Sequence, residues 1–192
     1  MKTEFEVKFY TDPVMIHKKL KSEHAKLLHQ SCLMKRWIYV IENQKNSWLR
    51  VRDEEDKTIL TYKTFDQDKA IDAVQELEVQ VESFEKMCQI LDVLNLKKLR
   101  YVENYREKWQ LHDCYIMIDT WPGLDKFIEI EGPSEQSVLS MVDRLSLSMD
   151  NALYGPTALL YEKKYGLSRQ MFDQIKELKF DTVENVIQKI KT

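Results

Sequence analysis

Charged side chains alternate with apolar ones near the start of the chain. Glu4, Glu6 and Lys8 are each followed by an apolar residue. Residues two apart lie on the same face of a β-strand, so these three charged side chains share one face of a predicted strand. Carboxylate oxygens are preferred ligands of Mg²⁺ and Mn²⁺, while lysine and arginine bind phosphate oxygens. Such a strand could contribute to a site that binds a metal ion together with a phosphate compound.

The same alternation returns in several later segments, and each of them presents one charged and one apolar face. The residues on the charged faces are Arg50, Arg52, Lys63, Glu76, Glu78, Asn104, Arg106, Lys108, Asp119, Trp121, Glu129 and Glu131. The apolar face of the segment around Glu76 is formed by Leu77, Val79 and Val81, which we expect to pack in the core. The chain has no GxxxxGK[ST] or GxGxxG loop, so side chains would have to hold any phosphate.

Two architectures satisfy this pattern of charged and apolar faces. In the ordinary antiparallel arrangement, the charged faces point to water and the apolar faces form a core with the helices. In the other, the sheet closes into a barrel, the charges line its interior, and helices cover the apolar exterior. A charged interior is costly unless it is occupied, and a polyanion with a divalent cation would neutralise it. The alternation alone does not decide between the two.

Composition and charge limit the class of protein. The chain has 192 residues and a hydrophobic fraction of 43%, which suit one domain, or one domain with an appended tail. Its net charge of −3 argues against a general nucleic-acid binder. The apolar runs are too short to span a membrane, and the charged start does not resemble a secretory signal. Cys32, Cys88 and Cys114 are odd in number and widely spaced, so we expect a reducing, cytoplasmic location.

The order of the predicted elements is that of an α+β protein. Strands without intervening helices pair antiparallel, which argues against a parallel doubly wound sheet. Strands are predicted near 4–9, 33–41, 47–54, 57–65, 74–82, 98–111 and 114–131, the last interrupted at 121–124. Helices are predicted near 12–28, from 83, at 133–147, 156–165 and 168–178, and from 181, with no strand after Gly155. The first helix would bury Val14, Ile16, Leu20, Leu27 and Leu28, and the second Phe84, Met87, Cys88, Leu91 and Leu94.

The run Glu4-Phe5-Glu6-Val7-Lys8 resembles the ExExK signature of the CYTH superfamily, the triphosphate tunnel metalloenzymes. Further segments that resemble the family follow in its order between residues 48 and 131: WLRVR, LTYK, ELE, Arg106, Ile118-Asp119 and GLDKFIEIE. The resemblance implies a closed eight-stranded antiparallel β-barrel with a polar lumen, covered by helices and followed by C-terminal helices. The expected domains are a tunnel domain at 1–166 and a helical extension at 167–192.

The resemblance also implies which residues form the site. The expected ligands of Mg²⁺ or Mn²⁺ are Glu4, Glu6, Asp119, Glu129 and Glu131. The expected triphosphate-binding residues are Lys8, Arg50, Arg52, Lys63 and Arg106. Glu76 and Glu78 would line the same tunnel and orient the basic groups. Lys8 would also be catalytic, positioning or deprotonating a water molecule if its neighbours lower its pKa.

Three functions fit these residues. Hydrolysis of an inorganic or organic triphosphate is preferred, because it needs only the residues found. The alternatives are a class IV adenylyl cyclase and a non-catalytic module that binds polyphosphate or nucleotide. The expected substrates are tripolyphosphate, thiamine triphosphate or ATP; neither nucleic acid nor a membrane is an expected partner, and a homodimer is expected by family analogy.

The chain departs from the family pattern in two places. Asn104 stands where many members have a lysine, and residues 30–34 do not reproduce the Gln-x-Asp-x-Tyr pattern of the cyclase-like branch. The four histidines show no HxxxH or HxH spacing, and no cysteine has a CxxC partner, so the spacing does not predict a zinc site.

Overall fold

The computed structural model describes residues 1–44, 46–66 and 71–191. Its strands are β1 (Lys2–Tyr10), β2 (Lys26–Val40), β3 (Ser47–Asp53), β4 (Thr58–Phe65), β5 (Val74–Val81), β6 (Lys97–Leu111), β7 (Cys114–Thr120), β8 (Phe127–Gly132) and β9 (Glu177–Leu178). Its helices are α1 (Pro13–Ser22), α2 (Phe84–Val93), α3 (Glu135–Arg144), the 3₁₀ turn η1 (Met149–Asn151), α4 (Ala158–Tyr165), α5 (Arg169–Phe172) and α6 (Val183–Lys191).

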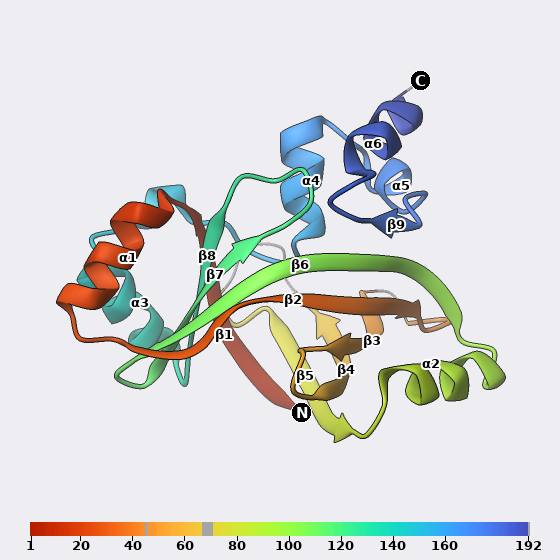
Figure 1. Cartoon of the computed structure of the whole chain (residues 1–192), viewed down its shortest axis with the longest axis horizontal. Helices are drawn as coiled ribbons and strands as arrows, with labels where there is room; N and C mark the ends of the chain where they lie inside the picture. The colour runs from red at the N-terminus through yellow and green to blue at the C-terminus, as the bar shows by residue number, and fades with distance from the viewer. Residues whose placement is uncertain (45, 67–70, 192) are drawn as a thin grey trace.

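The sheet closes on itself. Its strands follow the order β2-β3-β4-β5-β1-β8-β7-β6, and β6 pairs again with β2, which makes a ring of eight antiparallel strands. The long strands β2 and β6 run side by side across the molecule, and their pairing extends from Lys26↔Gln110 to Val40↔Lys97 (Figure 1). The predicted α+β fold with a closed eight-stranded antiparallel barrel is therefore confirmed.

Helix α1 is shorter than predicted. Asp12 caps it, since its side chain accepts a hydrogen bond from the Val14 amide, and Pro13 occupies the first turn. The helix ends at Ser22 rather than near residue 28, because His24 adopts a left-handed φ of 56° and the chain reverses into β2. Leu27 and Leu28 consequently belong to the strand and are 39% exposed.

Helices cover two regions of the outer barrel surface. Ile16 and Leu20 of α1 and Val138 and Val142 of α3 belong to one apolar cluster with Val7 of β1. On another side, α2 packs against β2 and β3, where Cys88 and Leu91 join Tyr39 and Val51 in a second cluster. Of the residues predicted to face the core from these helices, Val14 in the first turn of α1 and Leu94, which follows the end of α2, are exposed instead.

The outer face of β5 is exposed at Leu77 and Val79. Leu77 and Val79 are 61% and 55% exposed, so the prediction that this face packs in the core is wrong. The strand does place Glu76 on the opposite, inner face, where it is buried. The predicted division of β5 into a charged inner face and an apolar outer face is therefore confirmed. An apolar face is buried, however, only where another element packs on it.

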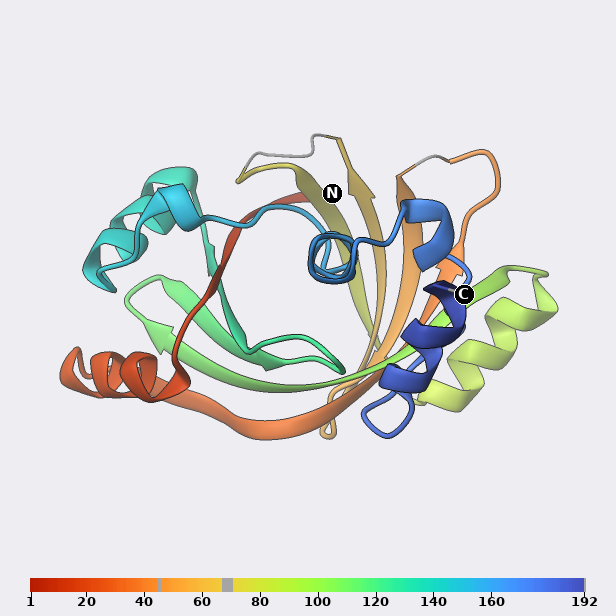
Figure 2. The same ribbon diagram turned by 90° about the horizontal axis from the view of Figure 1, so that it is seen from above.

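The C-terminal segment packs against one end of the barrel. Leu160 of α4, Phe172 of α5 and Ile187 of α6 form a third apolar cluster with Val102 and Trp121. In Figure 2, α4 is seen end-on over the concave side of the curved sheet. The short strand β9, which the sequence did not predict, pairs in parallel with β6 at Tyr101 and Val102. This edge of β6 is available because β7 pairs with β6 only from Tyr105 onward. The predicted domain boundary after residue 166 stays a prediction.

Within the described ranges, none of the helices combines the length and the apolar character needed to cross a membrane.

Candidate active site in the barrel interior

The barrel encloses a cavity of about 750 Å³. Every site residue expected from the sequence lines it, except Asp119, whose carboxylate is fully buried against Arg106 and Asn104. The strands achieve this because their charged faces turn inward, as Glu4, Glu6 and Lys8 do on β1. The structure thus places the charged faces inside the closed sheet and not in bulk water.

Arginines and glutamates form two groups on opposite sides of this interior, and two lysines lie among the glutamates. Arg36 on β2 and Arg50 and Arg52 on β3 form what we call the arginine wall. Glu4 and Glu6 on β1 and Glu129 and Glu131 on β8 form the carboxylate wall. In the eight-membered ring, β2 lies across from β1 and β3 lies across from β8, so the two walls face each other.

Arg36 is a site residue that the sequence analysis missed. Its side chain is buried, donates a hydrogen bond to Asn104 Oδ1, and has its guanidinium carbon 4.8 Å from the centre of the Trp121 ring. The inner face of β2 otherwise carries Met34, Ile38 and Val40, so the charged residue stands in an apolar pattern. Because Lys35 and Arg36 are adjacent, alternation did not show which of them faces inward; the only available signal was a basic residue within a predicted strand.

The arginine wall contains donors without acceptors. Among the described residues, none accepts a hydrogen bond from the buried Nε atoms of Arg36, Arg50 and Arg52. Each guanidinium uses Nη2 for a protein contact: Arg36 with Asn104, Arg50 with Thr61 at 3.1 Å and Glu78 at 3.2 Å, and Arg52 in an ion pair with Glu54. Buried donors are nearly always satisfied, so three that share one cavity indicate an anionic ligand.

The guanidinium groups also repel one another. Burial and then the charges of Arg52, Arg50 and Arg106 lower the pKa of Arg36 well below its usual value. Burial, followed by Arg52, lowers the pKa of Arg50 to about 10. These shifts mean that the charged state is costly in the free protein, and an anion between the arginines would offset that cost.

Lysines partly neutralise the carboxylates. Lys63 Nζ lies 2.6 Å from Glu4 Oε2 and 3.4 Å from Glu76 Oε2, and Lys8 Nζ lies 2.6 Å from Glu6 Oε1 and 3.4 Å from Glu129 Oε2. Both lysines line the cavity. Each lysine therefore bridges two of the glutamates that the sequence analysis assigned to metal binding or to tunnel support.

The carboxylate wall keeps uncompensated negative charge. Burial raises the pKa of Glu6, and the neighbouring Glu129 and Glu4 add to the effect against the opposing Lys8. Burial, with Glu4 and Glu129, also raises the pKa of Glu131. In contrast, burial alone would raise the pKa of Glu129, but Arg106 and Lys8 lower it far below the usual range. Burial alone would also raise the pKa of Glu4, but Lys63 lowers it. The negative charge that is not neutralised therefore lies at Glu6 and Glu131, where a divalent cation would favour the ionised form.

Asp119 holds Arg106 in position. Arg106 donates from Nε to Oδ1 at 2.8 Å and from Nη2 to Oδ2 at 2.6 Å, and Asn104 Nδ2 lies 3.2 Å from the same Oδ1. Both carboxylate oxygens of Asp119 therefore accept hydrogen bonds inside the protein. Asn104 stands where many family members have a lysine, and it contacts both Asp119 and Arg36. The guanidinium of Arg36 on β2 therefore supplies positive charge near residue 104.

Lys8 remains an ammonium group in this arrangement. Burial alone would lower its pKa, but Glu6 and Glu129 raise it above the usual value. The condition under which Lys8 was expected to deprotonate water, a pKa lowered by its neighbours, is not met while both carboxylates pair with it. Its geometry favours a role as a hydrogen-bond donor and a positive charge.

Two further residues at the end of the cavity near the β3–β4 hairpin were absent from the expected site. Glu54 pairs with Arg52 and Lys57; burial alone would raise its pKa, but these two cations lower it. Lys108 also lines the cavity, and burial lowers its pKa. Lys108 shares the inner face of β6 with Arg106. The alternation predicted this shared face but gave no role to Lys108. Glu54 lies just beyond β3, where strand periodicity no longer applies.

The opposite end of the cavity is covered by the C-terminal segment. Residues 156–159 of the α4 region and Tyr161 line the cavity, and Phe172 and Asp173 follow from the α5 region. Arg100 of β6 fastens this segment, since its Nε donates to the Ile175 carbonyl at 2.9 Å and its Nη2 to the Phe172 carbonyl at 2.5 Å. The C-terminal residues therefore shape the space that a ligand can occupy.

Comparison with known proteins agrees with this geometry. The model of the family described as the CYTH domain matches residues 2–157. The chain belongs to the CYTH family. Proteins similar to it include a candidate adenylate cyclase, MJ0240 of Methanocaldococcus jannaschii, which is 31% identical over an alignment of 114 positions; the match covers 55% of this chain and 65% of that protein. The matched region thus spans less than two thirds of that relative.

Solved structures share this CYTH fold at lower identity. A candidate adenylate cyclase from Vibrio parahaemolyticus superposes with a TM-score of 0.72 and 11% identity, covering 84% of this chain and 98% of the other. The candidate adenylyl cyclase HpAC1 from Hippeastrum, described as having a dominant triphosphatase activity, gives a TM-score of 0.55 and 14% identity over 88% of this chain and 98% of the other. At these identities the likeness concerns the fold.

Proposed function

We propose that this CYTH protein hydrolyses the terminal phosphoanhydride bond of a small inorganic or organic triphosphate, with Mg²⁺ or Mn²⁺ as cofactor. One observation carries the proposal: the buried Nε atoms of Arg36, Arg50 and Arg52 reach no acceptor among the described residues and share one cavity. Several buried, mutually repelling guanidinium groups need a ligand with several negative charges. A triphosphate supplies them along a short chain of phosphoryl groups.

The carboxylate wall suits the proposed cofactor. Glu4, Glu6, Glu129 and Glu131 offer oxygen donors, and the raised pKa values of Glu6 and Glu131 indicate negative charge that the nearby lysines do not fully neutralise. We keep Asp119 as a predicted ligand, although Arg106 and Asn104 occupy its oxygens in the free protein. The metal ion would neutralise phosphate charge and lower the pKa of a bound water molecule.

The residues of the chain would bind and orient the substrate. The arginine wall, Lys63 and Arg106 would neutralise the non-bridging oxygens, as phosphoryl transfer requires. Lys8 would donate hydrogen bonds from its ammonium group to a phosphate oxygen. Glu76 and Glu78 would orient Lys63 and Arg50, which they already contact. In the overall reaction, water adds to the terminal phosphorus, the bridging P–O bond breaks, and orthophosphate, diphosphate and a proton are released.

Hydrolysis is preferred to cyclisation because it requires no pocket for a base and no ribose hydroxyl near the α-phosphate. The triphosphatase activity described for the Hippeastrum structure supports the same choice. Tripolyphosphate, thiamine triphosphate and ATP are the substrates to test. A cytoplasmic location and a homodimer stay predictions.

The test is an assay of the purified protein with each of these three substrates and Mg²⁺ or Mn²⁺. We expect metal-dependent release of orthophosphate, and Arg52→Ala should weaken substrate binding, whereas Lys98→Ala on the outer surface should not. Formation of cyclic AMP and pyrophosphate from ATP, without orthophosphate release, would identify a cyclase. Tight binding without turnover of any substrate would identify a binding module, and either result would overturn hydrolysis.

A further inference from the structure

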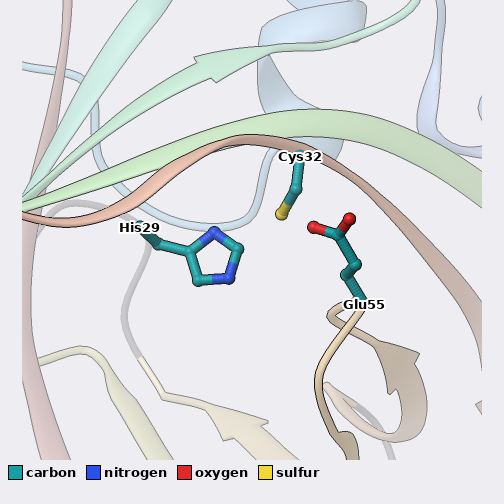
Figure 3. A group of neighbouring side chains, drawn as sticks. All are labelled: His29, Cys32 and Glu55. Atoms are coloured by element: carbon teal, nitrogen blue, oxygen red, sulfur yellow. The ribbon is translucent and has the colours of Figure 1, made fainter.

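Three side chains with nitrogen, sulfur and oxygen donors meet where the tip of the β3–β4 hairpin approaches β2. His29 and Cys32 come from β2, and Glu55 comes from the hairpin turn. One potential ligand atom from each residue lies within 4.8 Å of the other two. Figure 3 shows the Cys32 thiol and the Glu55 carboxylate pointing toward each other, with the His29 ring beside them. None of the three lines the barrel cavity, so this cluster is distinct from the proposed triphosphate site.

The backbone brings these residues together in a way that a regular strand would not. Residues three apart on a regular strand point to opposite faces, so His29 and Cys32 would diverge. The pairing of β2 with β6 shifts register between these two residues, and the irregularity allows both side chains to reach the same place. On the other side, Glu55 has a left-handed φ of 72°, and its amide donates to Asp53 Oδ1 at 3.3 Å.

The hydrogen bond of His29 suits a metal ligand. Its Nδ1 lies 2.9 Å from the Gln30 carbonyl oxygen, and a carbonyl can only accept, so Nδ1 donates this hydrogen bond. Nε2 is then the ring nitrogen that could bind a metal ion. Histidines that bind metals usually donate their other nitrogen to a carbonyl or carboxylate in this way.

The surrounding charge favours a cation. The turn contains Glu54, Glu55 and Asp56 in succession, and after burial these three carboxylates are the main causes that raise the pKa of the Cys32 thiol. The thiol is buried, and its hydrogen bond to the Arg106 carbonyl oxygen is long, at 3.9 Å. A bound cation would reverse the effect of the carboxylates and stabilise the thiolate.

We propose that His29, Cys32 and Glu55 bind one zinc ion or another borderline-soft divalent cation, with water completing a tetrahedral site. Imidazole, thiolate and carboxylate are the ligands that Zn²⁺ takes in proteins, whereas Mg²⁺ and Ca²⁺ prefer oxygen donors only. With metal–ligand bonds of about 2.0–2.3 Å, tetrahedral ligand atoms lie about 3.5 Å apart, so small side-chain rotations would complete the site. The spacing of histidines and cysteines in the sequence did not predict this site. One of its ligands, Glu55, comes from the β3–β4 hairpin and meets His29 and Cys32 only in the folded chain.

The site would fasten the hairpin to β2 at one end of the barrel. The same hairpin carries Arg52 and Glu54, which line the cavity. A metal ion held by His29, Cys32 and Glu55 would therefore fix the segment that positions one member of the arginine wall.

The test is a titration of the metal-free, reduced full chain with Co²⁺, which reports thiolate coordination by charge-transfer absorption in the near ultraviolet and tetrahedral geometry by its visible bands. We expect both signals to saturate at one Co²⁺ per chain and to disappear when Zn²⁺ is added. Cys32→Ser should abolish the charge-transfer band. Glu55→Gln, a change in an exposed turn that should fold normally, should weaken binding by about tenfold or more, as should His29→Gln.

Two controls separate this site from other metal binding. Cys88→Ala removes a cysteine of the α2 cluster and should leave the spectrum unchanged, and Glu129→Gln should also leave it unchanged because that residue belongs to the barrel interior. The proposal is overturned if the charge-transfer band is absent, if it survives Cys32→Ser, or if Glu55→Gln binds Co²⁺ as tightly as the unchanged protein. None of these outcomes depends on whether the barrel hydrolyses triphosphates.

Discussion

Arg36 of β2 donates a hydrogen bond to Asn104 of β6, and both side chains are buried in the barrel interior. Asn104 in turn contacts Asp119, which holds Arg106. The contact therefore connects the arginine wall to the ion pair on the neighbouring strands. The Nε atom of Arg36 is unsatisfied among the described residues, and neighbouring arginines lower its pKa, which is why we propose that it binds the ligand.

Replacing Arg36 should separate ligand binding from folding. We expect Arg36→Gln to weaken tripolyphosphate binding by about 10- to 100-fold, because one charge-assisted hydrogen bond contributes about 1.5–3 kcal/mol. The melting temperature of the free protein should stay the same or rise, since the change relieves repulsion and glutamine still offers a donor for Asn104. Calorimetric titration and thermal unfolding measure the two effects, with Lys98→Gln as a surface control. A drop in stability with unchanged affinity would show that Arg36 is structural.

Glu131 should matter for metal binding and little for folding. Its side chain is 22% exposed, and its ion pair with Lys2 is long at 3.7 Å, so its loss should change the free energy of unfolding by less than about 1 kcal/mol. We expect Glu131→Gln to weaken Mn²⁺ binding by about tenfold or more, measured by electron paramagnetic resonance of free Mn²⁺. Glu135→Gln on the outer helix α3 is the matched control. Equal Mn²⁺ affinity in both variants would show that Glu131 is not a metal ligand.

Glu76 should make the metal-free protein sensitive to pH. Burial, with the charge of Glu4, raises its pKa from 4.5 to about 7 against the opposing Lys63. A pKa that is higher in the folded state contributes stability below about pH 4.5, and this stability is lost as the pH rises through 7. In EDTA, Glu76→Gln should therefore be more stable than the unchanged protein at pH 8, on the order of 1 kcal/mol after allowance for solvent screening, and similar to it near pH 4.5.

The neighbouring Glu78 offers a contrast on the same strand. Its carboxylate accepts hydrogen bonds from Thr61 at 2.8 Å and from Arg50 at 3.2 Å. Glu78→Gln should therefore lower the stability at pH 8 by about 1 kcal/mol, opposite in sign to Glu76→Gln. Denaturant unfolding at the two pH values measures both variants, and a loss of stability in Glu76→Gln at pH 8 would contradict the burial argument.

Two valines should differ sharply in their contribution to stability. Val79 is 55% exposed on the uncovered face of β5, so Val79→Ala should change the free energy of unfolding by about 0.5 kcal/mol or less. Val51 is fully buried beneath α2, and Val51→Ala should cost about 2 kcal/mol through lost burial and a small cavity. Chemical denaturation measures both. Comparable losses would mean that another molecule covers β5 in solution.

Local patterns predicted which face of each strand carries the charged residues that line the cavity. Alternation identified Glu4, Glu6 and Lys8 as neighbours on one face, and the family resemblance indicated that this face turns inward. Helix signals found α1 through the Asp12 cap, but they did not show its end at Ser22, because the left-handed turn at His24 carries no glycine to mark it. The strand β9 was missed because two residues are too few for a periodic pattern.

The sequence by itself determined which residues share a strand face, since side-chain alternation is a local property of two-residue period. The tertiary structure decided which strands meet across the barrel, because ring closure through β2 and β6 depends on contacts between distant residues. That closure set Arg36 and the β3 arginines opposite the glutamates of β1 and β8, and it brought Glu55 to His29 and Cys32. It also left Leu77 and Val79 exposed, because none of the helices in the described part of the chain packs over them.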